Sequence, residues 1–144
     1  AGPEPRVTEA MHAYEIIADS YLSVSTPVQV AAPTLLRRAG DIRARIHARV
    51  RRNLQALRLA CQTRPAVSTL SVEGGWSAVL RVPAIRTEED LVMTLVTEDG
   101  VLVHPGYFFD MAREAFLVVS LIVDPEVFDR GIGVMLDRAA GSRS

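Results

Sequence analysis

The stretch from Asp41 to Gln62, DIRARIHARVRRNLQALRLACQ, predicts the longest helix of the chain. It contains neither Gly nor Pro, and its apolar side chains recur every three or four residues, which is the period of one helix face. These positions are Ile42, Ile46, Val50, Leu54, Leu57 and Cys61. We expect one continuous helix over residues 41–62, with Asp41 as its cap. Five of these side chains should face a sheet: Ile42, Ile46, Val50, Leu54 and Leu57.

The same region concentrates the positive charge. All 16 basic residues are Arg, and nine of them lie in residues 33–64 beside a single acid. Residues 1–32 and 65–144 carry net charges of −3 and −6. A basic segment can bind nucleic acid, but this one has no interleaved aromatic side chains on which bases would stack. We therefore favour the solvated or partner-facing side of an amphipathic helix, and nucleic acid is an unlikely partner.

Two shorter helices are predicted before the long one. The first covers residues 8–18, with Thr8 as a possible cap. The second follows Thr26-Pro27, which reads as a cap and a proline at the first helical position, and ends near Gly40.

After Pro65 the pattern changes to strands and helices in alternation. Strands are expected at residues 67–72, 76–82, 101–104 and 115–123, and helices begin after Thr87 and at Asp124. The order is helix, helix, long helix, β, β, α, β, β, α. It predicts an α+β fold, a two-layer sandwich with a small sheet packed on helices and preceded by a long helix.

Composition is that of one globular domain. The chain has 144 residues, 49% of them hydrophobic, and no apolar run of the roughly 18 to 20 residues that would span a membrane. Cys61 is alone, so an intrachain disulfide is excluded and a cytoplasmic location is expected. No His, Cys and Asp residues show metal-ligand spacing. The opening residues, Ala1 to Pro5, lack an initiator Met, and we expect a segment of a longer protein.

Five stretches carry a resemblance to a known family. They are YLSVSTPVQ at residues 21–29, the helix segments DIR at 41–43 and RRNL at 51–54, EGGW at 73–76, and GVLVHPGYFF at 100–109. In this order and at these spacings they resemble class I/II aminotransferases of fold type I, which depend on pyridoxal phosphate. The resemblance is to the C-terminal part of such enzymes.

The resemblance implies a division of labour between two parts of the parent protein. Residues 1–40 would be a remnant of the large domain and dimer interface, and residues 41–144 the small domain with its interdomain helix, 41–62. Such enzymes are homodimers that transfer an amino group between an amino acid-like donor and a 2-oxo acid. Their large domain, the partner missing here, holds the cofactor on a lysine, and the small domain closes over the substrate.

This chain contains no Lys, so it cannot supply the amine for a Schiff base or a lysine general base. We expect no catalytic residue in it, no bound cofactor and no activity of the chain alone.

The resemblance also implies site residues. Gly74, Gly75, Trp76 and His104 would lie near the substrate. The alternatives are an ordinary tight turn for the glycines, core packing for Trp76, and a simply hydrogen-bonded ring for His104. Ser23, Ser25 and Thr26 would lie at the dimer edge of the active site, with helix capping as their alternative.

Val118 marks a departure from the family. Members carry an Arg there that grips the substrate carboxylate through two hydrogen bonds. Either Arg113 or Arg81 replaces that Arg, or the substrate is not a standard α-amino acid; the donor and acceptor remain open. Strand alternation over 115–123 predicts that Val118 faces the cleft with Phe116 and Ser120, while Leu117, Val119 and Leu121 pack on helices.

Two other functions fit the sequence. The chain would share its fold with the C-terminal domain of a transcription regulator that responds to pyridoxal phosphate, and a winged helix-turn-helix upstream would identify that case. It would also fit a separate module that uses the Arg-rich helix on nucleic acid, for which a steep dependence of binding on salt would be the sign.

Overall fold

The computed structural model describes residues 3–21, 24–113 and 115–141. The chain divides into two compact units, Ala1–Ile42 and Arg43–Ser144. The first holds α1 (Glu4–Ser20), α2 (Thr26–Arg38) and the start of α3 (Gly40–Gln62). No residue of α1 or α2 is buried. The assignment of residues 1–40 to a large-domain remnant and of residues 41–144 to a small domain stays a prediction.

Three helix starts differ from the sequence-based expectation. α1 begins at Glu4, before Thr8, because Pro5 suits a first helical turn; the Thr8 hydroxyl donates to the Glu4 carbonyl at 3.1 Å. Thr26 is the first residue of α2 and Ser25 is its N-cap, without a capping side-chain hydrogen bond. Capping by Thr26 is therefore wrong. α3 begins at Gly40, which places Asp41 in its first turn.

The long helix is continuous over 23 residues, as predicted, but its buried stripe is shorter. Val50 and Leu57 are buried and Leu54 is half-buried. Ile42 and Ile46 are 54% and 37% exposed, so the expectation that they face the sheet is wrong. The core of the second unit extends along α3 only as far as Val50.

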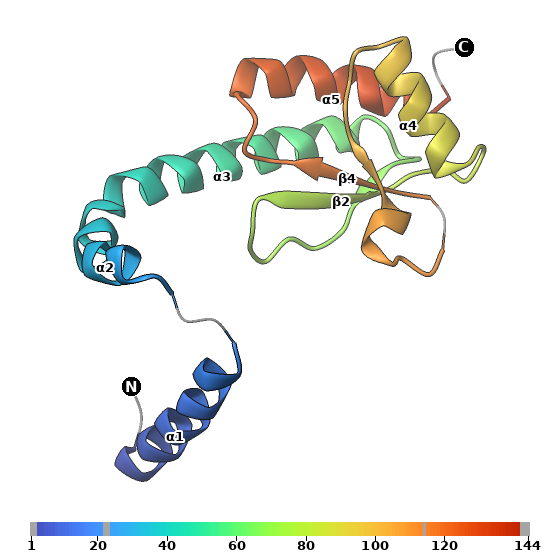
Figure 1. Cartoon of the computed structure of the whole chain (residues 1–144). Helices are drawn as coiled ribbons and strands as arrows, with labels where there is room; N and C mark the ends of the chain where they lie inside the picture. The colour runs from blue at the N-terminus through green and yellow to red at the C-terminus, as the bar shows by residue number, and fades with distance from the viewer. Residues whose placement is uncertain (1–2, 22–23, 114, 142–144) are drawn as a thin grey trace. The chain divides into compact units, whose positions relative to one another are not determined.

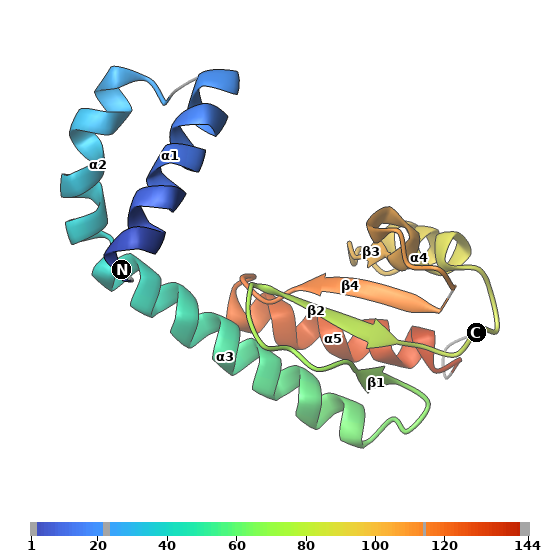
Figure 2. The ribbon, with the colours of Figure 1, turned by 90° about the horizontal axis from the view of Figure 1, so that it is seen from below.

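A four-stranded antiparallel sheet forms the second layer, in the order β1-β2-β4-β3. The central strands are β2 (Ser77–Arg81) and β4 (Phe116–Ser120), and the two-residue strands β1 (Ser68–Thr69) and β3 (His104–Pro105) lie outside them. Figures 1 and 2 show α3 and α5 (Pro125–Ala139) on one face of this sheet, with α4 (Glu88–Thr97) beside α5. The predicted α+β architecture and order of elements are confirmed.

The core lies between the sheet and these helices. It takes every second residue of the central strands together with one side of each helix, as a half-buried sheet requires. Its members include Leu57, Ala78, Leu80, Leu91, Leu95, Leu117, Val119, Leu121, Phe128, Ile132, Met135 and Leu136.

The two helices predicted to begin after Thr87 and at Asp124 are capped by these residues. The Thr87 hydroxyl accepts a hydrogen bond from the Asp90 amide at 3.1 Å at the start of α4, and the Asp124 carboxylate accepts one from the Glu126 amide at the start of α5.

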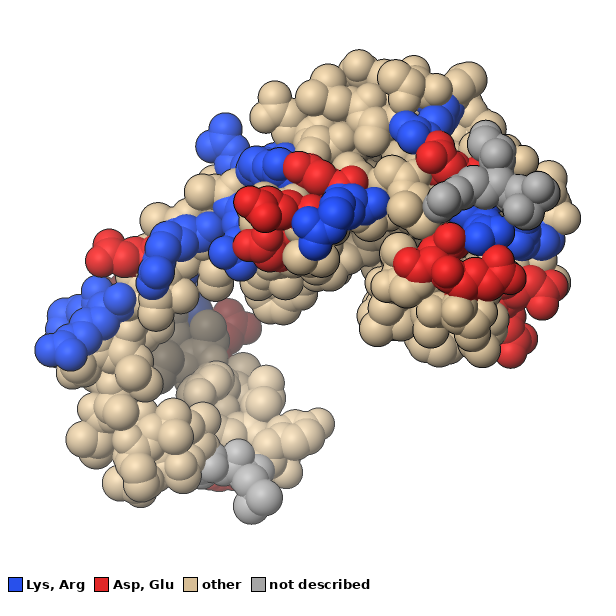
Figure 3. Space-filling view, turned by 90° about the horizontal axis from the view of Figure 1, so that it is seen from above, with Lys and Arg blue, Asp and Glu red and all other residues tan. Residues whose placement is uncertain are grey.

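Charge is distributed unevenly over the helical side of the second unit. Figure 3 shows basic side chains gathered along α3. Six of these arginines are exposed: Arg43, Arg45, Arg49, Arg51, Arg52 and Arg58. Arg64 instead donates to Asp137 of α5 at 2.8 Å, and the nearly buried Arg138 donates to Asp99 at 2.8 Å.

Among the described residues, no helix is long and apolar enough to cross a membrane.

Candidate functional site

One face of the sheet points away from the helices. We call it the outer face; because side chains alternate along a strand, it consists of the residues that lie between the core positions. They are Ser77, Val79 and Arg81 of β2, Phe116, Val118 and Ser120 of β4, and His104 of β3. Most of them are exposed or half-buried.

Val118 lies at the centre of the outer face. Its cross-strand partners are Val79 and His104, and these neighbours leave it only 6% exposed. It is absent from the core cluster, which contains Leu117, Val119 and Leu121. Val118 therefore occupies the side of the strand that alternation predicts. A contact with substrate stays a prediction.

His104 is exposed and sits at the edge of this face. Its ring lies 6.1 Å from the Phe108 ring and 6.2 Å from the Phe109 ring, measured between centroids. Those phenylalanines belong to η1 (Gly106–Phe109), a short 3-10 helix after β3. The structure thus brings His104 and Val118 together as direct partners, from positions 14 residues apart in the sequence.

The Gly74–Trp76 turn meets the chain at the end of β4, on the edge of β4 that pairs with β2. Gly75 has φ +76°, a left-handed conformation that favours glycine, so a tight turn is part of its role. Trp76 is 62% exposed, and core packing is therefore wrong for it. The Trp76 carbonyl accepts a hydrogen bond from the Leu121 amide at 2.7 Å. The turn is thus attached to the chain three residues beyond Val118.

The two candidate replacements for the missing arginine lie in different places. Arg81 is exposed on the outer face, opposite Phe116 and two residues from Val79. Arg113 lies in the bend before β4. Arg81 is therefore the one that the fold places on the same face as Val118.

The predicted dimer-edge residues belong to the first unit. Ser25 and Thr26 are exposed at the start of α2, and Ser23 lies outside the described residues. Their role at a dimer interface stays a prediction.

Glu88 is a buried polar residue that the sequence analysis did not single out. It is 3% exposed, and its carboxylate accepts hydrogen bonds from the Tyr107 amide at 3.0 Å and the Phe116 amide at 2.8 Å. It thereby takes the place of a backbone partner where β3 and β4 separate. Gly106 allows the close approach, since an added Cβ would lie 2.7 Å from the Phe116 Cβ. As an acid in a helix's first turn, Glu88 gives no signal of burial.

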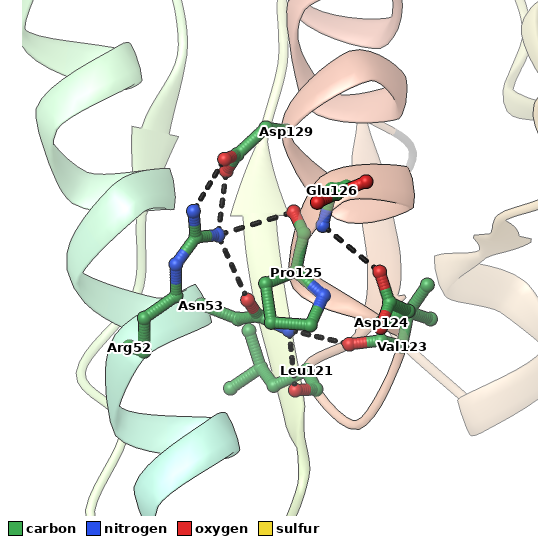
Figure 4. A network of polar contacts seen from close by, with 8 residues as sticks. All are labelled: Arg52, Asn53, Leu121, Val123, Asp124, Pro125, Glu126 and Asp129. Carbon is green, nitrogen blue, oxygen red and sulfur yellow. Dashed lines mark hydrogen bonds and ion pairs between the residues drawn. The ribbon is translucent and has the colours of Figure 1, made fainter.

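Asn53 is the second such residue, and the sequence does carry a signal for it. It falls between Val50, Leu54 and Leu57 on the apolar stripe of α3, and a polar side chain there needs buried partners. Figure 4 shows those partners: the Asn53 amide donates to the carbonyls of Leu121 at 2.9 Å and Val123 at 2.8 Å.

Arg52 adds an ion pair beside Asn53. Its guanidinium makes two parallel hydrogen bonds to Asp129 on α5, and it also donates to the Pro125 carbonyl at 3.2 Å (Figure 4). The hydrogen bonds from Arg52 hold the pKa of the Asp129 carboxyl below its ordinary value. This charge pairing joins α3 to the start of α5.

A groove of about 370 Å³ lies between residues 99–103, the end of β4 and α5. Val101, Val103, Phe128 and Ile132 are among its apolar walls. None of the predicted site residues lines it. In the described part of the chain, no three His, Cys, Asp or Glu residues are placed to hold a metal ion.

Comparison with known proteins relates this geometry to one class of enzymes. No family model and no curated protein sequence matches the chain. Solved structures do match. Alanine aminotransferase from Pyrococcus furiosus superposes with a TM-score of 0.72 at 17% identity, over 98% of this chain and 36% of its own. The chain has an aminotransferase fold.

Two further matches agree with that fold. A PLP-dependent aminotransferase from Streptococcus suis has a TM-score of 0.71 at 21% identity, over 93% of this chain. LysN, an α-aminoadipate aminotransferase from Thermus thermophilus, has a TM-score of 0.69 at 21% identity, over 92% of this chain. This chain spans 36% of each of these aminotransferases. The resemblance drawn from the sequence is confirmed at the level of the fold.

The cofactor of such enzymes can be tested against the residues present. Pyridoxal phosphate is held covalently by an amine side chain, and this aminotransferase-fold chain has no Lys. The outer face offers imidazole, hydroxyl and guanidinium groups instead. No side chain of this chain could form that covalent bond.

Proposed function

We propose that this chain is the C-terminal small domain, with the interdomain helix, of a PLP-dependent aminotransferase. The complete protein would transfer an amino group between an amino acid-like donor and a 2-oxo acid. The observation that carries the proposal is the pattern of coverage: 92 to 98% of this chain matches only 36% of three aminotransferases. The rest of the protein would supply the cofactor and its lysine, and would form a homodimer.

In this proposal the outer face and the Gly74–Trp76 turn lie beside the substrate. The outer face includes residues of β4, and the turn is bonded to Leu121 just after β4. One strand would therefore position the face and the turn. Trp76 and His104 are exposed, and each would lose water when the domain closes over the substrate. The chain would contribute binding and exclusion of water, and it would be inactive alone.

The position of Arg81 supports a specific role for it in substrate binding. Valine at position 118 cannot donate a hydrogen bond, and Arg81 is a cation on the same face. We propose that Arg81 binds the substrate carboxylate or a second acidic group of the substrate. Substrates that carry a second carboxylate, or a carboxylate at another position than in an α-amino acid, would then be preferred over simple α-amino acids.

The inactivity of the chain alone has a direct test. The purified chain is mixed with pyridoxal phosphate, reduced with borohydride and analysed by mass spectrometry after digestion. We expect an adduct on the α-amino group at most, because no side chain offers an amine. A pyridoxyl group on any side chain would contradict the proposal.

Activity itself is tested on the complete protein from which this chain comes. Transamination is assayed with a panel of amino acids and 2-oxo acids. The control is a truncated protein that ends before Gly40. We expect transamination by the complete protein and none by the truncated one. Finding a winged helix-turn-helix upstream, with no transamination, would instead favour a transcription regulator.

A further inference from the structure

The side chain of Asn53 is completely buried, and both partners of its amide nitrogen lie in one short segment. Its amide nitrogen donates to the Leu121 carbonyl at 2.9 Å and to the Val123 carbonyl at 2.8 Å. Its oxygen accepts from Arg52 at 3.1 Å. An amide group has two N–H donors, so both are used and the orientation of the side chain is fixed.

Leu121 connects this amide to the Gly74–Trp76 turn. Its carbonyl accepts from Asn53, its own amide donates to the Trp76 carbonyl at 2.7 Å, and its side chain is completely buried. Asn53 lies in α3, Trp76 immediately precedes β2, and Leu121 immediately follows β4. A short series of hydrogen bonds therefore runs from the helix, through the strand end, to the turn.

The turn has little other support. An added Cβ on Gly74 or Gly75 would meet no heavy atom within 4 Å, and Trp76 is 62% exposed. The space around the two glycines is open, so an added side chain would gain little packing there. The bond from the Leu121 amide to the Trp76 carbonyl attaches the end of the turn to the chain, next to the Ser77–Ser120 pair of β2 and β4.

We propose that Asn53 is a positioning residue for the Gly74–Trp76 turn and acts through Leu121. This inference deepens the proposed function, in which the turn lies beside the substrate. Without the Asn53 amide, a buried carbonyl and a partly buried one lose their donors, and the segment 121–123 would shift toward water to recover them. The Leu121 amide would move with it and release the Trp76 carbonyl.

The chain offers its own probe for this effect, because Trp76 is its single tryptophan. Asn53→Ala is compared with Arg64→Gln, which removes the bond to Asp137 just beyond the end of α3; the side-chain hydrogen bonds of Arg64 go to Asp137, Ala60 and Thr63. Hydrogen exchange is measured at the Leu121 and Val119 amides, and the anisotropy of Trp76 emission is recorded. Asn53→Ser, which keeps one donor, is the second variant should the alanine variant not fold.

We expect Asn53→Ala to speed exchange at Leu121 about tenfold or more, to leave Val119 unchanged and to lower the anisotropy of Trp76. Arg64→Gln should leave all three readings at the values of the unmodified chain, and Asn53→Ser should fall between. Unchanged readings in the Asn53 variants, or equal changes in Arg64→Gln, would overturn the proposal. No reading needs cofactor or substrate, so a failure of the aminotransferase proposal would be seen separately.

Discussion

Glu88 supplies hydrogen-bond acceptors at the edge of the sheet, where a neighbouring strand would otherwise supply them. Its two carboxylate oxygens accept from the amides of Tyr107 and Phe116, just beyond the last pair of β3 and β4. Glu88→Gln keeps the shape but leaves one acceptor oxygen for two donors. We expect a loss of about 1–3 kcal/mol in the free energy of unfolding, measured by urea titration.

The matched control is the neighbouring acid, Glu89, which is exposed. Glu89→Gln removes the same charge from the same helix turn, and a change within about 0.5 kcal/mol is expected. Equal losses in the two variants would show that charge near the helix start, and not the two hydrogen bonds, is what matters.

Under the proposed function, Val118 gives a residue-scale prediction for the complete protein. If valine stands where aminotransferases carry their carboxylate-binding arginine, Val118→Arg should raise kcat/KM for a simple α-amino acid. A charge-assisted pair is worth about 1.5–3 kcal/mol, which corresponds to roughly tenfold or more. Val118→Leu is the control for size. Loss of stability without any gain for the arginine variant would refute the specificity interpretation.

The Arg52–Asp129 pair links two elements, and its carboxyl makes the link sensitive to acid. Because the pKa of Asp129 is lowered in the folded protein, its contribution to stability is present above its ordinary pKa of 3.8. That contribution is lost as the pH falls through the lower folded value. We expect the stability difference between the unmodified chain and Asp129→Asn to shrink below about pH 4. Thermal unfolding at several pH values measures it, and a difference independent of pH would contradict the assignment.

The order of elements could be predicted because each one has a local signal. The stripe of α3 and the cap residues Thr87 and Asp124 are examples. The extent of each element could not be predicted in the same way. Ile42 and Ile46 continue the period of Val50 and Leu57, but periodicity does not say where the core ends. That limit is set by α5 and the sheet, far along the chain.

The candidate site was predictable only as separate pieces. His104 and Val118 become neighbours through the β3–β4 register, which no local pattern encodes. Asn53 and Glu88 depend on backbone groups that lie 68 and 28 residues away, at Leu121 and Phe116. Their chemistry is visible in the sequence, whereas the partners that bury them are not.

At the scale of the whole molecule, the two units should differ in stability. The second has its own core, and α1 and α2 have no buried residue. Removing residues 1–39 should therefore leave the midpoint of thermal unfolding within about 2 °C, because little apolar surface is lost. Circular dichroism of both chains measures it, and a large drop on removal would show that the first unit supports the second.

The exposure of α1 and α2 also has a calorimetric consequence. The heat capacity of unfolding grows with the apolar surface that water reaches, at about 12–15 cal/mol/K per residue of a folded domain. Helices that bury nothing add almost none of it, and they unwind gradually because short helices in water are marginal. The chain of 144 residues should therefore unfold with the heat capacity of a domain of roughly 100, about 1.2–1.5 kcal/mol/K, on a sloping baseline contributed by its first forty residues.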